Sequence, residues 1–434
     1  MMEMKVKGWL VLLAMMMFLA ACTQTQTQSQ SGDKKTVVIA VQGTNPFLEA
    51  AAGKFEREHP DIDIEIKSYM AMPEADGSGM TSSMSQADIE KYIQTVTTQI
   101  MAGKGSDLIL LDNLPQNKLV EKKVLVNLYD WMEKDSAFDK DDYYENVFKA
   151  AQDGAGLYAL PVGVNLEVIQ GNLKLLNKAN IKIDDGSWTW DQFKAIARKL
   201  NAQEGQDYYA FVNLFPANLL LSYIEDNYAD LVQRDGQANF DSDSFRDMMR
   251  QIKSMYDEHV LQAEFTYDYD KALFSQAVLP GPEEGLRLMT MPGKEIFKSP
   301  TAKGESKGIP YSSWLNLGMN SKSKVQQEAW QFIKFLLSEE MQQSPELSGF
   351  PVNKKAAEKR IDEAASKIKG DPAAAQAKAD ELKQLLKQTD VKLSTDFKVQ
   401  SIAIAEFETY MSGQKTAAEV SKLIQNKVTT YLNE

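Results

Sequence analysis

Short apolar runs alternate with amphipathic segments in the first quarter of the chain, and this alternation restricts the possible folds more than any other feature of the sequence. Residues 36–41 and 107–111 are largely apolar, and residues 62–66 alternate apolar with acidic side chains, so we expect three strands. Residues 47–58 and 89–102 place their apolar side chains on one helical face. This order of strands and helices predicts a parallel sheet covered by helices.

Later segments continue the mixed α/β pattern. Residues 156–163 predict another strand. Thr189 and Gln192 have the spacing of a capping box at a helix start, and Trp188 and Phe193 have the spacing of the hydrophobic staple that accompanies it. Further helices are expected at 214–231, 244–258, 328–338 and 416–432, and a solvated pair of helices at 354–389.

The N-terminus has the organisation of an export signal. Lys5 and Lys7 precede an apolar run over residues 9–21, which is too short to cross a bilayer core that needs about 20 residues. The run ends in small residues before Cys22, and a stretch of Thr, Gln and Ser follows. This pattern resembles a bacterial lipobox, which implies cleavage before Cys22 and attachment of lipid to its thiol.

An ordinary signal peptide that happens to contain a cysteine is the alternative interpretation. Cys22 is the only cysteine of the chain, so no disulfide can use it, and this favours the lipoprotein. We therefore expect residues 1–21 to be a lipoprotein signal peptide and residues 22–35 to be a flexible tether. The rest of the chain is long enough for two domains.

The composition argues against several functional classes. A net charge of −13 disfavours nucleic acid as a partner. The only histidines, His59 and His259, lie in charged surroundings, so neither a zinc site nor a catalytic triad is expected. Residues 102–106 lack the spacing of a phosphate-binding loop. We expect no metal, no cofactor and no catalysis, although 61 acidic residues leave a glycosidase-type pair of carboxylates open.

Seven segments in the same order resemble the family 1 extracellular solute-binding proteins of ABC importers, a group that includes maltodextrin-binding proteins. They are residues 47–60, 103–108 (GKGSDL), 158–161, 189–193 (TWDQF), 328–336 (EAWQFIKFL), 349–352 and 412–416. The loop 70–86 and the helical insert 354–389 are longer than is usual in that family. Residues 165–172 lack the family's common Tyr-Asn pair, so ligand contacts are not carried over from that segment.

The resemblance implies a two-lobe α/β fold of the periplasmic-binding-protein type (type II), with three hinge crossings and a ligand cleft between the lobes. Lobe one is placed at 36–160 plus 280–350, and lobe two at 162–278 plus 352–434. It also implies a monomer that is tethered outside the cell by lipid, closes around a small-molecule solute and delivers it to the membrane subunits of an ABC importer.

Candidate ligand-binding residues follow the expected strands, where loops converge at the cleft. Sugars present apolar faces and hydroxyl edges, so both polar and aromatic side chains are expected at a site that binds them. The candidates are Gln42, Thr44 and Asn45 after the first strand, Asp112 and Asn113 after the third, Asn165 after the hinge, Tyr311 and Trp314 in a polar loop, and Phe215 and Tyr223. Trp314 is the strongest of them, with a packing role between the lobes as its alternative. Trp190 and Trp330 are expected to be structural.

Three hypotheses about function remain at this stage. The first is a carbohydrate-binding lipoprotein of an importer. The second keeps the fold but binds another solute, such as a polyamine, a short peptide or a phosphorylated polyol. A cluster of carboxylates in the cleft would favour an amine, and a cluster of Arg would favour phosphate. The third is a secreted glycosidase or lyase, which would need two carboxylates in catalytic geometry.

Overall fold

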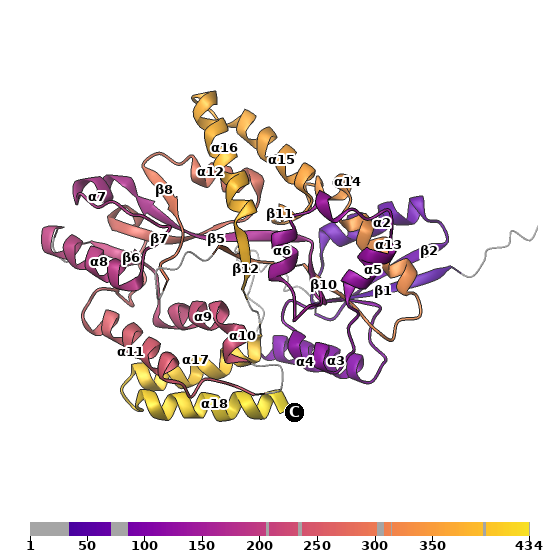
Figure 1. Ribbon diagram of the computed structural model, residues 1–434, viewed down its shortest axis with the longest axis horizontal. Coiled ribbons are helices and arrows are strands. Elements are labelled where there is room, and N and C mark those ends of the chain that lie inside the picture. The colour runs from indigo at the N-terminus through magenta and orange to yellow at the C-terminus, as the bar shows by residue number, and fades with distance from the viewer. Residues whose placement is uncertain are drawn as a thin grey trace, which may run out of the picture.

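The computed structural model describes most of the chain outside its N-terminal segment (Figure 1). The described residues are 34–70, 86–204, 208–232, 237–301, 308–313, 315–393 and 396–433. Cys22, most of the loop 70–86 and Trp314 lie outside these ranges. Two sheets organise the described chain, and we name the parts built on them lobe one and lobe two.

The sheet of lobe one contains the three strands expected from the N-terminal alternation. Its five strands follow the order β2-β1-β3-β10-β4 and are β2 (Ile62–Ser68), β1 (Lys35–Val41), β3 (Leu108–Leu110), β10 (Asn316–Met319) and β4 (Leu160–Pro161). Strand β1 pairs in parallel with β2 and β3, whereas β10 runs antiparallel to β3 and β4. The expected parallel sheet is therefore confirmed at its N-terminal strands.

Helices cover both faces of this sheet because the strand side chains alternate. Val37 and Ile39 of β1 pack with Phe55 of α2 (Pro46–Glu58) in one core. Ala40 points to the opposite face and packs with Val96 of α3 (Gln86–Met101) in a second core. The period of two along the strand thus decides which helix each residue meets. In Figure 1, α2 and α3 lie on opposite sides of β1.

The sheet of lobe two has seven strands, with the long strand β5 at its centre. The strands are β5 (Gly163–Asn172), β6 (Tyr209–Val212), β7 (Ala272–Leu279), β8 (Lys294–Phe297), β9 (Ile309–Ser312), β11 (Phe350–Pro351) and β12 (Thr389–Lys392). The order along the sheet is β12-β9-β5-β7-β6, and β8 and β11 also pair with β5. The expected strand 156–163 is short, since only β4 and the start of β5 are extended there.

The helix predicted from the capping box begins as expected. Gln192 N donates to Thr189 Oγ1 (3.1 Å), and Thr189 N donates to Gln192 Oε1 (2.7 Å), at the start of α8 (Trp190–Glu204). Trp188 and Phe193 are buried with ring centroids 6.4 Å apart in an edge-to-face arrangement. Because all four residues are close in sequence, local chemistry alone specifies this start.

The other predicted helices are present, one of them with an interruption, together with several short helices that were not predicted. The expected helix 214–231 is divided at Asn227 into α9 (Pro216–Asp226) and α10 (Tyr228–Leu231). The remaining helices are α4 (Gln116–Glu121), α5 (Leu128–Lys134), α6 (Glu145–Ala150), α7 (Leu173–Lys178), α11 (Asp243–Asp257), α12 (Pro282–Met289), α13 (Gln326–Leu336), α14 (Glu339–Gln342), α15 (Lys354–Lys367), α16 (Pro372–Lys387), α17 (Phe397–Met411) and α18 (Ala417–Asn433), with short 3₁₀ turns at Lys140–Asp142 and Tyr269–Lys271.

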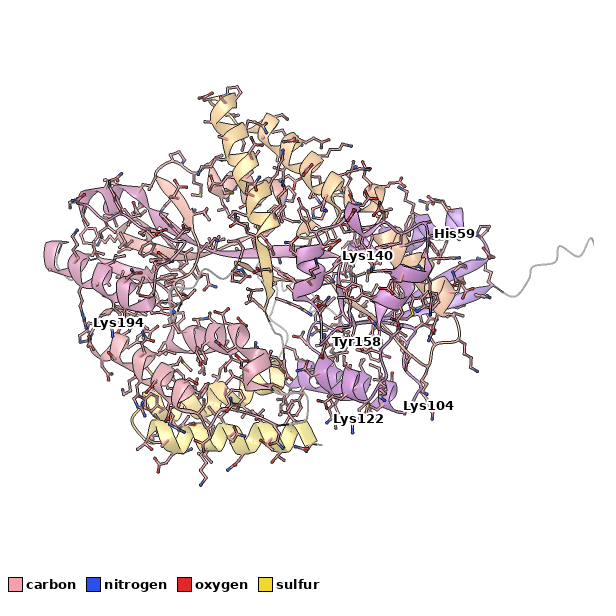
Figure 2. The ribbon with its side chains drawn as sticks, in the orientation of Figure 1. His59, Lys104, Lys122, Lys140, Tyr158 and Lys194 are labelled. Carbon is pink, nitrogen blue, oxygen red and sulfur yellow. The ribbon has the colours of Figure 1, made fainter. Side chains whose placement is uncertain are left out.

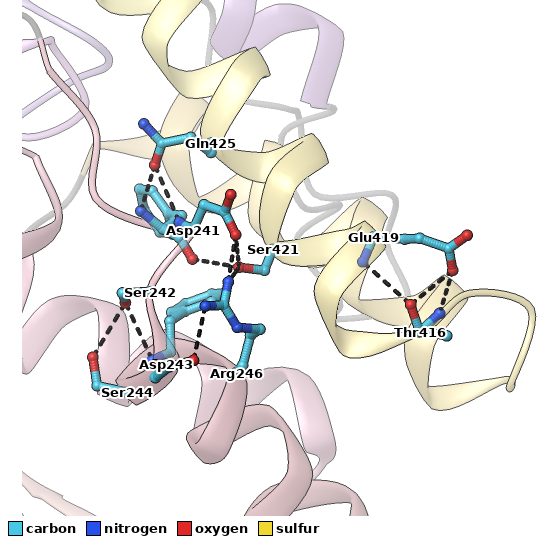
Figure 3. Close-up of polar contacts among 11 residues, drawn as sticks. Asp241, Ser242, Asp243, Ser244, Arg246, Thr416, Glu419, Ser421 and Gln425 are labelled. Carbon is cyan, nitrogen blue, oxygen red and sulfur yellow. Dashed lines mark hydrogen bonds and ion pairs between the residues drawn. The ribbon is translucent and has the colours of Figure 1, made fainter.

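Polar contacts dock the C-terminal helix α18 onto the loop that precedes α11 (Figure 3). Ser421 is fully buried and donates to the carbonyl of Phe240 (2.7 Å). Gln425 accepts from Phe240 N (2.7 Å) and donates to Ala238 O (2.6 Å). Arg246 pairs with Asp243 and contacts Ser421 Oγ (3.4 Å). These bonds satisfy backbone groups that would otherwise be buried without partners, so they fix α18 against lobe two.

The helical insert 354–389 is a pair of helices, α15 and α16, but one face of the pair is buried. Ile361, Leu382 and Leu386 are fully buried and share a core with Leu279 and Leu286. Charged side chains cover the opposite face, as the sequence predicts. The insert is therefore anchored next to the hinge, where Figure 1 shows it rising above β5.

Three chain segments cross between the lobes and are bonded to one another. They are the β4–β5 junction at Val162, the β9–β10 junction at residues 312–316, and the segment around β11. Gln342 Nε2 donates to Val162 O (3.0 Å) and Ser313 Oγ donates to Gly163 O (2.7 Å). Gly349 has φ 93°, and a Cβ there would lie 2.9 Å from the backbone of Val164. The crossing thus needs glycine at this position.

The segment 280–350, which the sequence analysis places in lobe one, is shared by the two sheets. Strands β8 and β9 pair with β5 in lobe two, whereas β10 and α13 pack with lobe one. Within the described residues, no helix combines the length and apolar character needed to cross a membrane.

Candidate functional site

A cavity of about 340 Å³ lies between the two lobes, which is within the usual size of a small-molecule site. Lobe one contributes Leu111, Leu114, Gln116, Asn117 and Asn316 to the described walls, and the end of α6 contributes Ala150, Ala151, Gln152 and Asp153. Helices α9 and α10 and the C-cap of α10 contribute Glu225, Asp226, Tyr228, Ala229 and Val232. The region of β12 and the start of α17 contributes Asp390, Val391, Lys392 and Asp396. A solute in this cavity would touch both lobes.

Asp112 and Asn316 form a buried pair beside the cavity on the lobe-one side. Asp112 accepts hydrogen bonds from Asn316 N (3.1 Å) and Asn316 Nδ2 (2.7 Å), and Asn316 Nδ2 also donates to Ser313 O (2.9 Å). Burial raises the pKa of Asp112 to about 6, although the hydrogen bonds from Asn316 favour its ionised form. Asn316 is 3% exposed, and its Oδ1 has no hydrogen-bond partner among the described residues.

Lys392 of β12 enters the cavity wall from the opposite side. Its Nζ donates to Gln116 Oε1 (3.1 Å), so β12 is linked to α4 of lobe one. Burial lowers the pKa of Lys392 to about 8, and the attraction of Asp112 and Asp153 opposes this effect. Strand β12 therefore contributes a cationic group whose charge is attracted by the carboxylates of Asp112 and Asp153.

Glu225 at the end of α9 has a different environment, because its charged neighbours are acidic. It accepts a hydrogen bond from Gln400 Nε2 (3.1 Å) of α17. Burial raises the pKa of Glu225 to about 8, and the carboxylates of Glu167 and Asp226 raise it further. Glu167 of β5 accepts from Ser312 Oγ (2.9 Å), and burial raises its pKa as well.

Asp396 is another carboxylate of the cavity wall, and it forms hydrogen bonds within the protein. Its carboxylate caps α17 by accepting from Lys398 N (3.2 Å) and Val399 N (3.1 Å). Tyr228 OH donates to it as well (2.8 Å). Burial raises the pKa of Asp396 despite these hydrogen bonds. This residue therefore shapes the wall by holding α10 against α17.

Two contacts join the lobes at another point between them. Glu90 of α3 forms an ion pair with Lys398 of α17 (3.6 Å). Lys118 Nζ of α4 lies 5.8 Å from the ring centre of Tyr431 of α18. Both contacts connect helices of lobe one to the C-terminal helices of lobe two, so they hold the two lobes together in this conformation.

The structure places the candidates after β1 and β3 close together. Asn113 Nδ2 donates to Gln42 Oε1 (2.8 Å), as expected for the carboxyl ends of neighbouring parallel strands. Thr44 is exposed, and Asn45 is the N-cap of α2, where its side chain accepts from Leu48 N (3.0 Å). Asp112 reaches the cavity wall through Asn316.

The described aromatic candidates are not wall residues of the cavity. Tyr311 is fully buried, and its OH donates to Val147 O (3.0 Å). Phe215 precedes α9, and Tyr223 packs on Phe245 with ring centroids 6.1 Å apart. Trp314 lies outside the described residues. None of the described candidates is a wall residue, and their role in binding stays a prediction.

Asn165 is also buried, at 6% exposure, and its Oδ1 has no hydrogen-bond partner among the described residues. Trp330 is core, as expected, since it is 1% exposed and its Nε1 donates to Asp135 (2.9 Å). Trp190 packs edge-to-face on Phe193 at the start of α8, which is the structural position expected for it.

The sequence analysis missed the residues of the cavity wall, and the charged ones among them matter most for the chemistry of the site. Asp153, Glu225 and Lys392 belong to three elements far apart in the chain, so no spacing connects them. A local signal exists only for Lys392, because residues 389–393 (TDVKL) alternate in the manner of a strand.

The described residues offer no arrangement typical of metal or histidine chemistry. No group of three or more His, Cys, Asp or Glu side chains in the described part of the chain is positioned to hold a metal ion. His59 packs on Phe55 with ring centroids 4.2 Å apart, and Figure 2 shows it on the outer side of lobe one. Neither His59 nor His259 is a wall residue of the cavity.

Comparison with known proteins agrees with this architecture. The family model of the bacterial extracellular solute-binding protein matches residues 40–343. Among solved structures, the chain is similar to an ABC substrate-binding protein from Listeria monocytogenes in complex with cycloalternan (17% identity, 92% of this chain and 100% of that one, TM-score 0.58). It is also similar to the maltose-bound MalE3 of T. maritima (16% identity, 91% and 99%, TM-score 0.56).

A third similar structure is a sugar transporter protein from Rhizobium etli in an open conformation (15% identity, 91% of this chain and 98% of that one, TM-score 0.61). At these identities the likeness concerns the fold, which is the two-lobe type II arrangement expected from the sequence. Members of the matched family bind solutes and are not enzymes. Because the family model covers more than half of the residues, the chain belongs to the bacterial extracellular solute-binding proteins.

Proposed function

We propose that this protein is the lipid-anchored, extracellular solute-binding component of an ABC importer and that it captures a carbohydrate by hinged closure of its lobes. The observation that carries the proposal is the polar cavity whose walls come from both lobes. A solute bound there contacts each half of the molecule, so its binding favours the closed arrangement over the open one. Similar proteins named with maltose and cycloalternan support a saccharide.

The cavity walls suit a ligand rich in hydroxyl groups. Gln116, Asn117 and Gln152 offer amides that can donate and accept, and the carboxylates of the walls accept. Each sugar hydroxyl can donate one hydrogen bond and accept others, so a saccharide can satisfy such a mixed set. The hinge residues around Val162 and Ser313 would carry the motion, because their hydrogen bonds join the crossing segments.

Thermal unfolding of the mature protein against a panel of mono- and oligosaccharides tests this function. A ligand present at a hundred times its dissociation constant is expected to add about 2.7 kcal/mol to the free energy of unfolding. The melting temperature should therefore rise with at least one saccharide and stay constant with inositol phosphate and short peptides. A panel in which no saccharide raises the melting temperature contradicts the proposal.

The lipid anchor has a separate test in Cys22. We expect Cys22→Ser to prevent lipid attachment, since serine offers no thiol, and to move the protein from the membrane fraction to the medium or the soluble fraction. Fractionation followed by mass analysis of the mature N-terminus checks this. Ser31→Ala in the same tether is the matched control and should leave the protein in the membrane fraction. Equal distribution of the Cys22→Ser and unaltered proteins argues against the anchor.

A further inference from the structure

The charges that face the cavity are unevenly distributed. Carboxylates reach the described walls from four places in the fold, namely Asp153 after α6, Glu225 and Asp226 on α9, Asp390 on β12 and Asp396 before α17. Among the described wall residues, Lys392 is the only cation. Other lysines, such as Lys104, Lys122 and Lys194, lie toward the outside of the two lobes in Figure 2.

Lys392 offsets the negative charge of the carboxylates on only one side of the cavity. Its charge is coupled to Asp112 and Asp153, and its Nζ donates to Gln116. The charged groups that act on Glu225 are the carboxyl groups of Glu167 on β5 and Asp226 on α9, and its hydrogen-bond partner is the neutral amide of Gln400 on α17. Among the described residues, Glu225 therefore has no cationic partner, although its carboxyl group is largely buried in the cavity wall. Buried carboxylates are normally paired, because an isolated charge is costly in a low dielectric.

A second group, in the lobe-one wall of the same cavity, also lacks a donor among the described residues. Asn316 is 3% exposed, its Nδ2 is used by Asp112 and Ser313, and its Oδ1 has no partner among the described residues. A buried amide oxygen without a hydrogen bond is costly to maintain. A ligand that donates hydrogen bonds would therefore satisfy both Asn316 Oδ1 and the Glu225 carboxyl group. A ligand with a positive charge would in addition complement Glu225.

We propose that the solute is an amino sugar whose ammonium group binds Glu225 while its hydroxyl groups bind the amide and carboxylate groups of the remaining walls. This inference rests on the proposed carbohydrate function and specifies the chemical class of its ligand. An ammonium donates up to three hydrogen bonds and supplies the positive charge that lets Glu225 ionise. A neutral sugar brings no positive charge and would leave Glu225 protonated.

Proton release is a consequence of this pairing. In the ligand-free protein, burial and the neighbouring carboxylates raise the pKa of Glu225 to about 8, so the group is mostly protonated at neutral pH. An ammonium beside it favours the carboxylate, so binding must lower this pKa and release a proton. The affinity for an amino sugar should therefore increase from pH 6 to pH 8. A neutral sugar of the same shape should bind without this proton release.

Calorimetric titration of the mature protein with matched sugars tests the inference. The probes are glucosamine against glucose and N-acetylglucosamine, and the chitosan disaccharide against cellobiose and diacetylchitobiose. We expect at least tenfold tighter binding of the free amine within each set, and a binding enthalpy at pH 7 that changes with the ionisation enthalpy of the buffer. Equal or tighter binding of the neutral analogues overturns the amino-sugar inference and leaves the carbohydrate function standing.

The variant Glu225→Gln isolates the group that carries the inference. Glutamine keeps the size and the hydrogen bond to Gln400 and cannot bear charge, so we expect a roughly 10- to 100-fold loss of affinity for the amino sugar and loss of the proton release. The neutral analogue should lose little. Glu264→Gln, at an exposed carboxylate of the same lobe, is the matched control and should bind as the unaltered protein does.

Two further outcomes count against the account. If Glu225→Gln binds the amino sugar with unchanged affinity, Glu225 does not hold its ammonium group and the inference fails. If spermidine and putrescine bind and no sugar of either kind does, the carbohydrate function fails together with the inference, because the cavity then takes an amine without a saccharide.

Discussion

Replacing Gln342 with alanine is expected to lower the free energy of unfolding by roughly 3–5 kcal/mol. Gln342 is fully buried where the crossing segments meet. Its Nε2 donates to Val162 O (3.0 Å) and Leu336 O (3.0 Å), and its Oε1 accepts from Val352 N (2.8 Å) and Asn353 N (3.2 Å). Alanine would leave these backbone groups buried without partners and would open a void beside them. Urea unfolding followed by circular dichroism measures the effect.

The neighbouring glutamine provides the control for this prediction. Gln343 is the C-cap residue of the same short helix, and its side chain bonds to the surface groups Glu339 (2.9 Å) and Lys359. Gln343→Ala should change the free energy of unfolding by less than about 1 kcal/mol. If the two variants unfold at the same urea concentration, the hydrogen bonds of Gln342 do not hold the crossing together as we describe.

The second large effect concerns the pH dependence of stability. The pKa of Glu225 lies at about 8 in the folded protein, above its ordinary value of 4.5, because burial and nearby carboxylates disfavour the charge. Between these two values the folded state holds a proton that the unfolded state has released, so the contribution of Glu225 to stability is present below pH 4.5 and is lost as the pH rises toward 8. Without ligand, the free energy of unfolding of the Glu225→Gln variant should therefore exceed that of the unaltered protein by about 2–3 kcal/mol at pH 8.5. At pH 4 the two free energies should be equal.

Chemical unfolding of both proteins across this pH range measures the difference. All other titrating groups are common to the two proteins, so the difference between their stability curves reports Glu225 alone. Glu264→Gln should give a curve parallel to that of the unaltered protein. A Glu225→Gln curve that stays parallel as well would show that Glu225 ionises freely, and would remove the electrostatic basis of the amino-sugar inference.

Parts of the fold were predictable because short stretches of sequence specify them. The strand β1 follows from the branched apolar residues 36–41, and the start of α8 follows from Thr189, Gln192 and the flanking aromatic residues. The family resemblance supplied the two-lobe arrangement, which local patterns do not reveal. The buried face of α15 and α16 was not predicted, because a sequence with few apolar and many charged residues is typical of helices exposed to solvent.

The cavity was less predictable, since tertiary packing assembles it. Aromatic residues in polar segments are candidates from the sequence, yet Tyr311 lies in β9, where Ile309 and Tyr311 are both buried and the Tyr311 hydroxyl donates to Val147 O of α6. The carboxylates of the cavity come from elements separated by up to about 240 residues, from Asp153 to Asp396. Nothing in their local sequence distinguishes Glu225 from the many acidic residues at the surface. The importance of Glu225 follows from its burial and from the acidic character of the charged groups that act on it among the described residues.

Distance measurements between the lobes test the central claim most directly, namely that the lobes close around a saccharide. Cys22 is the only cysteine, so a Cys22→Ser chain accepts two spin labels at chosen sites. Lys122→Cys at the end of α4 and Lys422→Cys on α18 place exposed labels on lobe one and lobe two. Pulsed electron resonance should give a shorter and narrower distance distribution when a saccharide that raises the melting temperature is added. An unchanged distribution at saturating saccharide would contradict closure of the lobes around the solute.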